Sequence, residues 1–71
     1  MPWKKSFCER LQSRRESLGL TKTALSKMVG ISNVSIREFE IGRKVPTVDT
    51  LVALADALGV STDWLLGRDT D

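Results

Sequence analysis

Residues 21–40 read Thr-Lys-Thr-Ala-Leu-Ser-Lys-Met-Val-Gly-Ile-Ser-Asn-Val-Ser-Ile-Arg-Glu-Phe-Glu. Thr21 and Ser32 suit helix N-caps, because a hydroxyl oxygen accepts a hydrogen bond from the free N–H groups of the first turn. Gly30 can end the first of these helices, since glycine adopts the left-handed conformation at little cost. The stretch therefore predicts two short helices joined by a sharp turn at residues 30–32.

The residues around this turn allow the two helices to pack closely. Ala24 is small at the expected crossing point, and Ile31 and Ile36 are apolar where the second helix must pack on the first. This arrangement predicts a helix-turn-helix, a unit that holds its second helix out for the major groove of DNA.

Three more helices are predicted around this unit from caps, apolar stripes and closing glycines. They run from residue 6 to residue 18, from Thr47 to Gly59, and from Ser61 to Gly67. The residues expected to face the core are Phe7, Leu11, Leu18, Ala24, Leu25, Met28, Val29, Ile36, Phe39, Val48, Leu51, Val52, Ala55 and Leu58. The chain is predicted to be all-α, with five helices and no strand.

The composition of the 71 residues excludes several kinds of chemistry. One Cys cannot form an internal disulfide or a thiolate metal cluster. Without His, the chain has no His-based zinc site and no Ser-His or Cys-His catalysis. No apolar run approaches the roughly 18 residues of a membrane span. We therefore expect a cytoplasmic protein that is not an enzyme, with no metal, cofactor, membrane or small-molecule partner.

The net charge of +2 conceals two halves of opposite sign. Residues 1–44 hold ten Lys or Arg and four Glu, a net charge of +6, whereas residues 45–71 hold one Arg and five Asp, a net charge of −4. A basic half suggests a polyanionic partner such as nucleic acid, and two ordinary solvated faces are the alternative.

A longer pattern of residues resembles the Cro/repressor type of helix-turn-helix family, also called the xenobiotic-response-element type. The resemblance covers residues 6–67. It is carried by Ala24-Leu25-Ser26, Val29-Gly30-Ile31-Ser32, Ile36, Phe39-Glu40, Gly42, Leu51, Leu54-Ala55, Ala57-Leu58-Gly59-Val60-Ser61 and Asp63-Trp64-Leu65-Leu66. It implies a compact, phage-repressor-like domain of a transcriptional regulator that binds operator DNA as a twofold dimer. Lys22 is a departure, because the family often has Gln at that position.

The resemblance implies that Asn33, Val34 and Glu38 read bases. An Asn amide can pair with adenine, a Glu carboxylate can accept from cytosine, and a Val methyl can contact the thymine methyl group. Helical geometry independently points four residues away from the core, namely Val34, Arg37, Glu38 and Ile41. As alternatives, Glu38 orients Arg37 or Lys22, and the two apolar residues are scattered surface hydrophobes.

Contacts to the DNA backbone are expected on both sides of the third helix. Thr21 and Lys22 open the second helix, whose free N–H groups attract anions. Arg43 and Lys44 follow the third helix, whereas Arg14 is expected to be a solvated surface charge. Supporting contacts to bases or phosphates are expected from Ser32, Ser35 and Arg37.

Two further sets of residues have structural roles in this family. Arg15 and Glu40 border apolar faces, and a partly buried charge generally has a partner. The family often joins these two positions in a salt bridge. The segment that resembles the family's dimer interface, for which a plain monomer core is the alternative, contains Leu58, Val60, Trp64 and Leu65.

These observations predict a sequence-specific DNA-binding regulator, a repressor of phage or bacterial type, which binds a pseudo-palindromic operator as a homodimer. Residues 1–5 are expected to form a basic arm, 6–67 the DNA-binding domain, and 68–71 a polar tail or the start of a linker. The chain is either a whole Cro-like, antitoxin or controller protein or the first domain of a longer repressor. A protein-interaction adaptor of the same fold, with little DNA affinity, is the alternative from another class.

Overall fold

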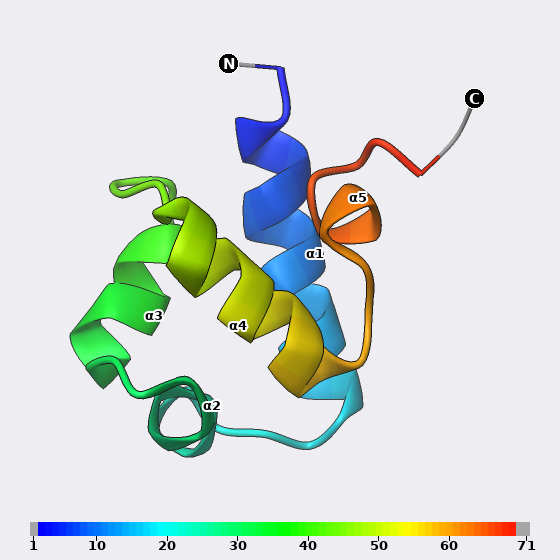
Figure 1. The fold of residues 1–71 in the computed structure, drawn as a ribbon. Helices are drawn as coiled ribbons and strands as arrows, with labels where there is room; N and C mark the ends of the chain where they lie inside the picture. The colour runs from blue at the N-terminus through cyan, green and yellow to red at the C-terminus, as the bar shows by residue number, and fades with distance from the viewer. Residues whose placement is uncertain (1, 70–71) are drawn as a thin grey trace.

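The computed structural model describes residues 2–69, and all regular structure within them is helical (Figure 1). The prediction of an all-α fold with five helices is confirmed. The helices are α1 (Lys4–Ser17), α2 (Lys22–Val29), α3 (Asn33–Glu40), α4 (Val48–Leu58) and α5 (Thr62–Leu65).

Hydroxyl side chains begin four of these helices. Thr21, Ser32, Thr47 and Ser61 each accept a hydrogen bond from the backbone N–H group three residues later, at 3.0–3.2 Å. Each bond satisfies one of the N–H groups that a helix leaves without a partner in its first turn. These caps lie where the sequence predicted them, so local chemistry determines where α2 to α5 begin.

The N-terminal helix begins differently from the prediction. Lys4 and Lys5, expected in an arm, are instead the first two residues of α1. Trp3 is the N-cap residue, and its carbonyl oxygen accepts from Phe7 N at 2.9 Å. The Trp3 ring also packs edge-to-face on Phe7, at 6.2 Å between ring centroids. This packing holds Trp3 at the N-cap, so that the helix begins at Lys4, and Met1 lies outside the described residues.

All five helices contribute to one apolar core. Phe7 and Phe39 pack edge-to-face within it, with ring centroids 6.0 Å apart, and so join α1 to α3. The buried apolar side chains are Phe7, Leu11, Leu25, Ile36, Phe39, Leu54, Ala55, Leu58 and Leu65. This core fixes the position of α3 relative to the rest of the chain.

Four residues expected to face this core are exposed instead. Leu18 is 43% exposed, Met28 56%, Val48 76% and Val52 44%, whereas Leu54 is fully buried. Leu18 is the C-cap residue of α1 and Val48 is the first residue of α4, so both lie at helix ends. In α4 the core-facing line runs through Leu54, Ala55 and Leu58, and Val52 lies off that line.

The C-terminal residues are attached to the helices. Arg10 Nη1 donates to Trp64 O and to Asp69 Oδ1, both at 2.8 Å, and its guanidinium lies over the Trp64 ring, 4.8 Å from the centroid. Arg68 N donates to Asp63 O at 2.8 Å. Residues 68 and 69 are therefore not a free polar tail, and residues 70 and 71 lie outside the described residues.

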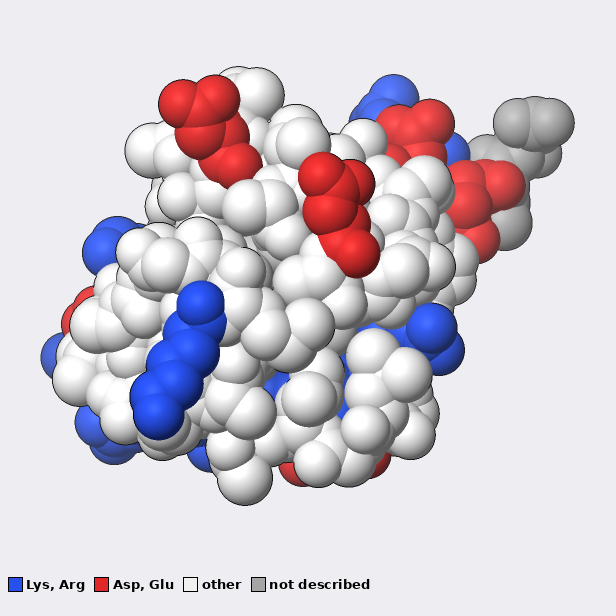
Figure 2. Space-filling view, turned by 60° about the horizontal axis from the view of Figure 1, so that its bottom comes forward, with Lys and Arg blue, Asp and Glu red and all other residues white. Residues whose placement is uncertain are grey.

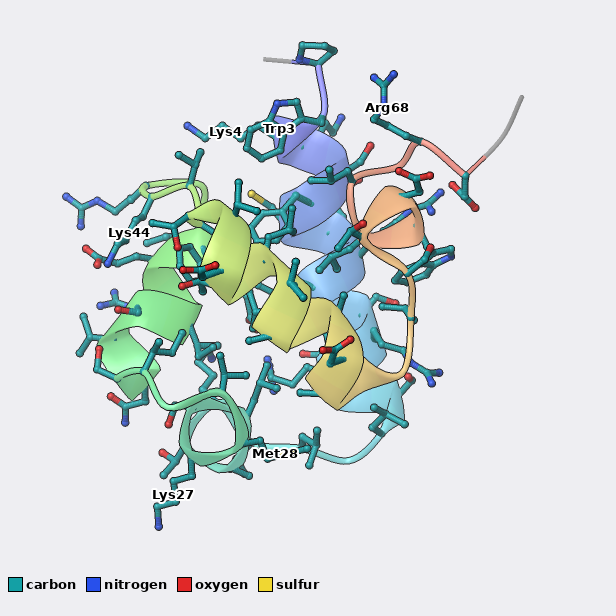
Figure 3. All side chains as sticks on the ribbon, in the orientation of Figure 1. Trp3, Lys4, Lys27, Met28, Lys44 and Arg68 are labelled. Carbon is teal, nitrogen blue, oxygen red and sulfur yellow. The ribbon has the colours of Figure 1, made fainter. Side chains whose placement is uncertain are left out.

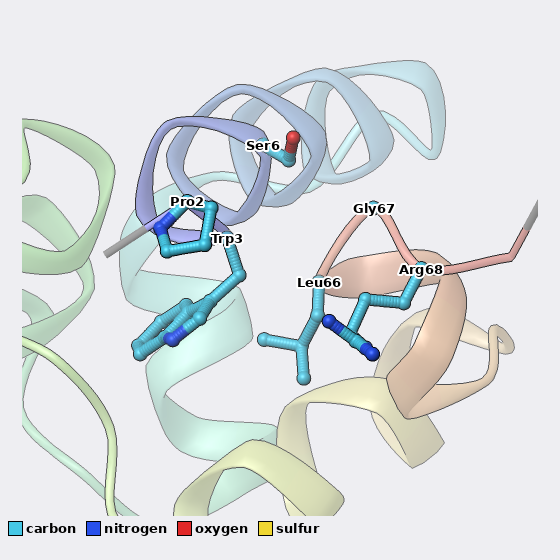
Figure 4. Close-up of a pocket in the computed structure, with 6 residues that line it drawn as sticks. All are labelled: Pro2, Trp3, Ser6, Leu66, Gly67 and Arg68. Carbon is cyan, nitrogen blue, oxygen red and sulfur yellow. The ribbon is translucent and has the colours of Figure 1, made fainter.

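A shallow pocket lies where the start of α1 meets the segment after α5 (Figure 4). The two segments approach so closely that a Cβ atom added to Gly67 would lie 2.6 Å from Ser6 Cβ. The lining residues are Pro2, Trp3, Ser6, Leu66, Gly67 and Arg68.

Candidate nucleic-acid interface

The turn between α2 and α3 occupies residues 30–32, as the sequence predicted. Gly30 has a φ of 81°, and its N–H group and that of Ile31 both donate to Ser26 O, at 2.8 and 3.1 Å. These two hydrogen bonds end α2, and α3 begins at Asn33 with Ser32 as its N-cap. The two helices thus form a helix-turn-helix.

The third helix has one buried face and one free face. Ile36 is 0% exposed and Phe39 2% exposed, whereas Val34 and Ile41 are 56% and 52% exposed. The helical geometry predicted this division. Nothing in the described part of the chain covers the outer face of α3, so its side chains are available to a ligand.

The three expected base-reading residues lie on or near this free face. Asn33 and Val34 are exposed in the first turn of α3, and Glu38 is half-buried one turn later. Asn33 Nδ2 donates to Thr23 Oγ1 of α2 at 3.3 Å, a contact that the sequence analysis missed. Within residues 2–69, Glu38 forms no ion pair with Arg37 or Lys22.

Two of the three expected supporting residues, Ser32 and Ser35, form side-chain hydrogen bonds at the start of α3. Ser32 Oγ bonds to Ser35 Oγ at 3.1 Å, and Lys44 Nζ donates to Ser35 Oγ at 3.3 Å. The Lys44 ammonium also lies over the Phe39 ring, 5.7 Å from the centroid. These contacts hold Lys44 against α3, while Arg37 remains exposed.

The expected phosphate-contacting residues lie before and after α3. Thr21 and Lys22 are exposed at the start of α2, where N–H groups point outward. Arg43 and Lys44 are exposed in the loop after α3. Lys4 of α1 extends toward this loop, with its Cε atom beside Gly42 (Figure 3). A third basic side chain therefore adjoins that loop.

Arg15 and Glu40 meet in the interior. Arg15 Nε donates to Glu40 Oε2 at 2.7 Å and Nη2 donates to Oε1 at 3.1 Å, with side chains 8% and 3% exposed. The hydrogen bond to Glu40 raises the pKa of the Arg15 guanidinium above its ordinary value, so the group stays charged. Arg15 Nη1 also donates to Leu20 O at 2.8 Å. One side chain thus joins α1, α3 and the segment before α2.

The Helix-turn-helix family description matches residues 11–65. This chain belongs to the helix-turn-helix family. Repressor protein C2 of Salmonella phage P22 is 44% identical over 61 residues, which are 86% of this chain and 28% of that protein. The cryptic phage CTXphi transcriptional repressor RstR of Vibrio cholerae is 40% identical over 60 residues, 84% of this chain and 54% of that protein. The chain thus spans about half or less of these relatives.

A solved structure of the P22 protein has the same architecture. The crystal structure of the P22 c2 repressor in complex with a synthetic operator superimposes with a TM-score of 0.85 and 43% identity. The match covers 89% of this chain and 96% of that one. The described helices of this helix-turn-helix protein are therefore arranged as in a repressor that was crystallised on DNA.

One face of this helix-turn-helix protein has its charges unevenly distributed. In Figure 2 the larger acidic patches lie toward the top and right of the view, and basic side chains lie mainly toward the left and lower left, with others at the right edge. Arg14 was expected to be solvated, but its Nε atom donates to Leu58 O at 2.9 Å and closes the end of α4. Its positive charge stabilises the carbonyl end of that helix.

Two of the four residues expected at a dimer interface are buried in the core. Leu58 is 1% exposed and Leu65 is 0% exposed, so both belong to the core and cannot contact a second chain. Val60 and Trp64 are half-buried against the core, and Arg10 covers the Trp64 ring. For Leu58 and Leu65 the structure thus agrees with the alternative reading, in which these residues form part of the core of one chain.

Within the described residues, no helix has the length and apolar character needed to cross a membrane. The same residues contain no group of three His, Cys, Asp or Glu side chains placed to hold a metal ion.

Proposed function

We propose that this chain is a sequence-specific DNA-binding module of a transcriptional repressor, which inserts α3 into the major groove of operator DNA. The observation that carries the proposal is that the outer face of α3 is exposed. Asn33 and Val34 are exposed there, and basic residues stand at both ends of the helix-turn-helix. A base-edge contact needs such exposed groups in the first turn of the inserted helix.

The fit to a repressor supports the choice of ligand. The P22 structure with a TM-score of 0.85 was determined on an operator, and α3 corresponds to the second helix of the motif. In such a complex Asn33, Val34 and Glu38 are the base-reading residues. Thr21, Lys22, Arg43 and Lys44 bind phosphates, and Ser32, Ser35 and Arg37 support them. This is a binding function without catalysis, performed in the cytoplasm.

The proposal includes a homodimer on a pseudo-palindromic operator. The exposed apolar residues of α4 support it, since Val48 and Val52 lie one turn apart and are 76% and 44% exposed. We place the contact between copies on this face of α4 rather than on Leu58 and Leu65. Val60 and Trp64, the other two residues expected at the interface, are half-buried.

Selection of bound DNA from a random pool tests the proposal. We expect enrichment of one preferred sequence and, at low salt, weaker binding to all DNA. An adaptor of the same fold would enrich no sequence and would not shift random DNA in an electrophoretic assay. The control variant combines Asn33→Ala and Val34→Ala, which should abolish the enrichment and leave the low-salt shift in place.

A further inference from the structure

One hydrogen bond joins the starts of the two helices of the motif. Thr23 is the second residue of α2 and Asn33 is the first residue of α3. Asn33 Nδ2 donates to Thr23 Oγ1 at 3.3 Å, and both residues are exposed. We propose that Thr23 is a positioning residue, whose hydroxyl holds the Asn33 amide in the orientation that reads adenine. The inference rests on the proposed function.

The Thr23 hydroxyl can accept the bond from Asn33 whatever its own proton donates to. A hydroxyl has one donor and two acceptor lone pairs, so donation to another group leaves Oγ1 able to accept. Within residues 2–69, the Asn33 amide is the one group that bonds to Thr23 Oγ1.

Lys22 cannot replace Thr23 in this contact. An ammonium group has three donors and no acceptor, so it cannot accept a hydrogen bond from the Asn33 amide. The Thr21 hydroxyl at the N-cap accepts from Ala24 N, and the acceptor that the Asn33 amide contacts is Thr23 Oγ1. Because Thr is branched at Cβ, its χ1 angle is restricted, and the acceptor has a narrow range of positions.

The braced amide keeps the groups that adenine needs. Asn33 has two N–H donors and one carbonyl oxygen, and the bond to Thr23 uses one donor. The second N–H can donate to adenine N7, while Oδ1 accepts from the adenine amino group. Both bonds can form without loss of the contact to Thr23. The free protein then holds the reading orientation in advance, which lowers the entropic cost of binding.

The test compares Thr23→Val with Thr23→Ser, each in the full chain. Val keeps the branched shape without the hydroxyl, and Ser keeps the hydroxyl. Affinities are measured for the sequence selected from the random pool and for duplexes changed at one position at a time. We expect Thr23→Val to reduce discrimination roughly two- to tenfold at the adenine position read by Asn33. Other positions and non-specific DNA should be unaffected, and Thr23→Ser should behave as the parent chain.

A double-mutant cycle separates positioning from other roles. Once Asn33→Ala is present, Thr23→Val should cause no further loss, because the group that it positions is gone. The inference is overturned if Thr23→Val leaves discrimination between DNA sequences unchanged. It is also overturned if Thr23→Val weakens binding to all DNA sequences equally, as loss of a phosphate contact would. A third contrary result is that Thr23→Val reduces discrimination by the same factor in the Asn33→Ala chain as in the parent chain. Equal melting temperatures for the parent chain and the two Thr23 variants exclude a folding defect.

The same measurements distinguish this inference from the proposed function. If the parent chain enriches no sequence, the proposed function fails and this inference fails with it. If the parent chain enriches a site and Asn33→Ala relaxes one adenine position, the proposed function stands. A Thr23→Val variant that keeps full discrimination at that position would then refute the role of Thr23 alone.

Discussion

Arg15 and Glu40 face each other through two hydrogen bonds, at 2.7 and 3.1 Å, in a part of the core from which both side chains are shielded. The two residues belong to α1 and α3. The guanidinium therefore fixes α3, the helix that carries the exposed Asn33 and Val34, to α1. Its remaining bond to Leu20 O ties the segment before α2 to the same point.

Arg15→Met should destabilise the fold strongly, because it leaves the Glu40 carboxylate buried without a partner. Loss of one member of a buried pair costs about 3–5 kcal/mol, whereas replacement of both by apolar residues is nearly neutral. Arg15→Met together with Glu40→Leu should therefore recover most of the loss in a urea unfolding experiment. Additive losses would show that the two residues do not act as a pair.

Local chemistry explains why much of the fold was predictable from the sequence. A cap such as Thr21 and a turn glycine such as Gly30 act through backbone groups within four residues, and the structure has both as predicted. Burial of an α4 residue depends instead on which side of α4 the other helices pack against. The spacing of apolar residues in the sequence therefore did not distinguish Val52, which is exposed, from Leu54, which is buried.

The same reasoning explains which contacts of the site were missed. Arg14 meets a carbonyl oxygen 44 residues away in sequence, and Arg10 meets Asp69 at a separation of 59. A local sequence pattern does not predict contacts between residues that are so far apart in the chain. The contact between Thr23 and Asn33 spans 10 residues across the turn. It could have been found by asking which hydroxyls at the start of α2 lie opposite the start of α3.

Gly67→Ala should be more destabilising than Gly19→Ala. Both glycines have positive φ angles, +73° and +70°, so each substitution has the cost of a left-handed alanine, about 1–2 kcal/mol. Only at Gly67 would the new Cβ meet another atom, at 2.6 Å from Ser6 Cβ. Urea unfolding of the two variants measures the difference. Equal losses would mean that the segment after α5 moves away from α1 without cost.

Lys22→Ala and Arg43→Ala should weaken binding to all DNA sequences by similar factors. Each removes one phosphate contact, so the slope of log affinity against log salt should fall by about 1. Arg68→Ala is the matched control, because it removes the same charge outside the proposed interface and should leave the slope unchanged. A change in base preference without a change in slope would reassign either residue to base reading.

Val34→Ala should reduce the preference for thymine over uracil at one operator position. Val34 has methyl groups and no hydrogen-bonding group, so it distinguishes these bases through the thymine methyl alone. The melting temperature should barely change, since the side chain is 56% exposed. Ile41→Ala is the control, because Ile41 is 52% exposed at the other end of α3. Equal effects of the two variants on this preference would contradict the assignment.

The preferred DNA should be a pseudo-palindrome whose half-site centres lie about 10–10.5 bp apart, roughly 34 Å along the duplex. The described chain measures 33 × 23 × 20 Å, so two copies side by side can place two α3 helices at that spacing on one face of the DNA. Selection from a random pool, followed by affinity measurements on one and two half-sites, tests this geometry.

Val52→Glu should weaken binding to the two-half-site operator and leave binding to a single half-site unchanged. Asp49 and Asp56 of α4 lie three residues before and four residues after Val52, so a new carboxylate adds repulsion to the face that we assign to the second copy. Leu18→Glu is the control, since Leu18 is exposed to nearly the same extent, 43% against 44%, at the end of α1. A loss on the single half-site would indicate a direct effect on DNA binding. Asymmetric, isolated half-sites in the selected pool would refute the homodimer itself.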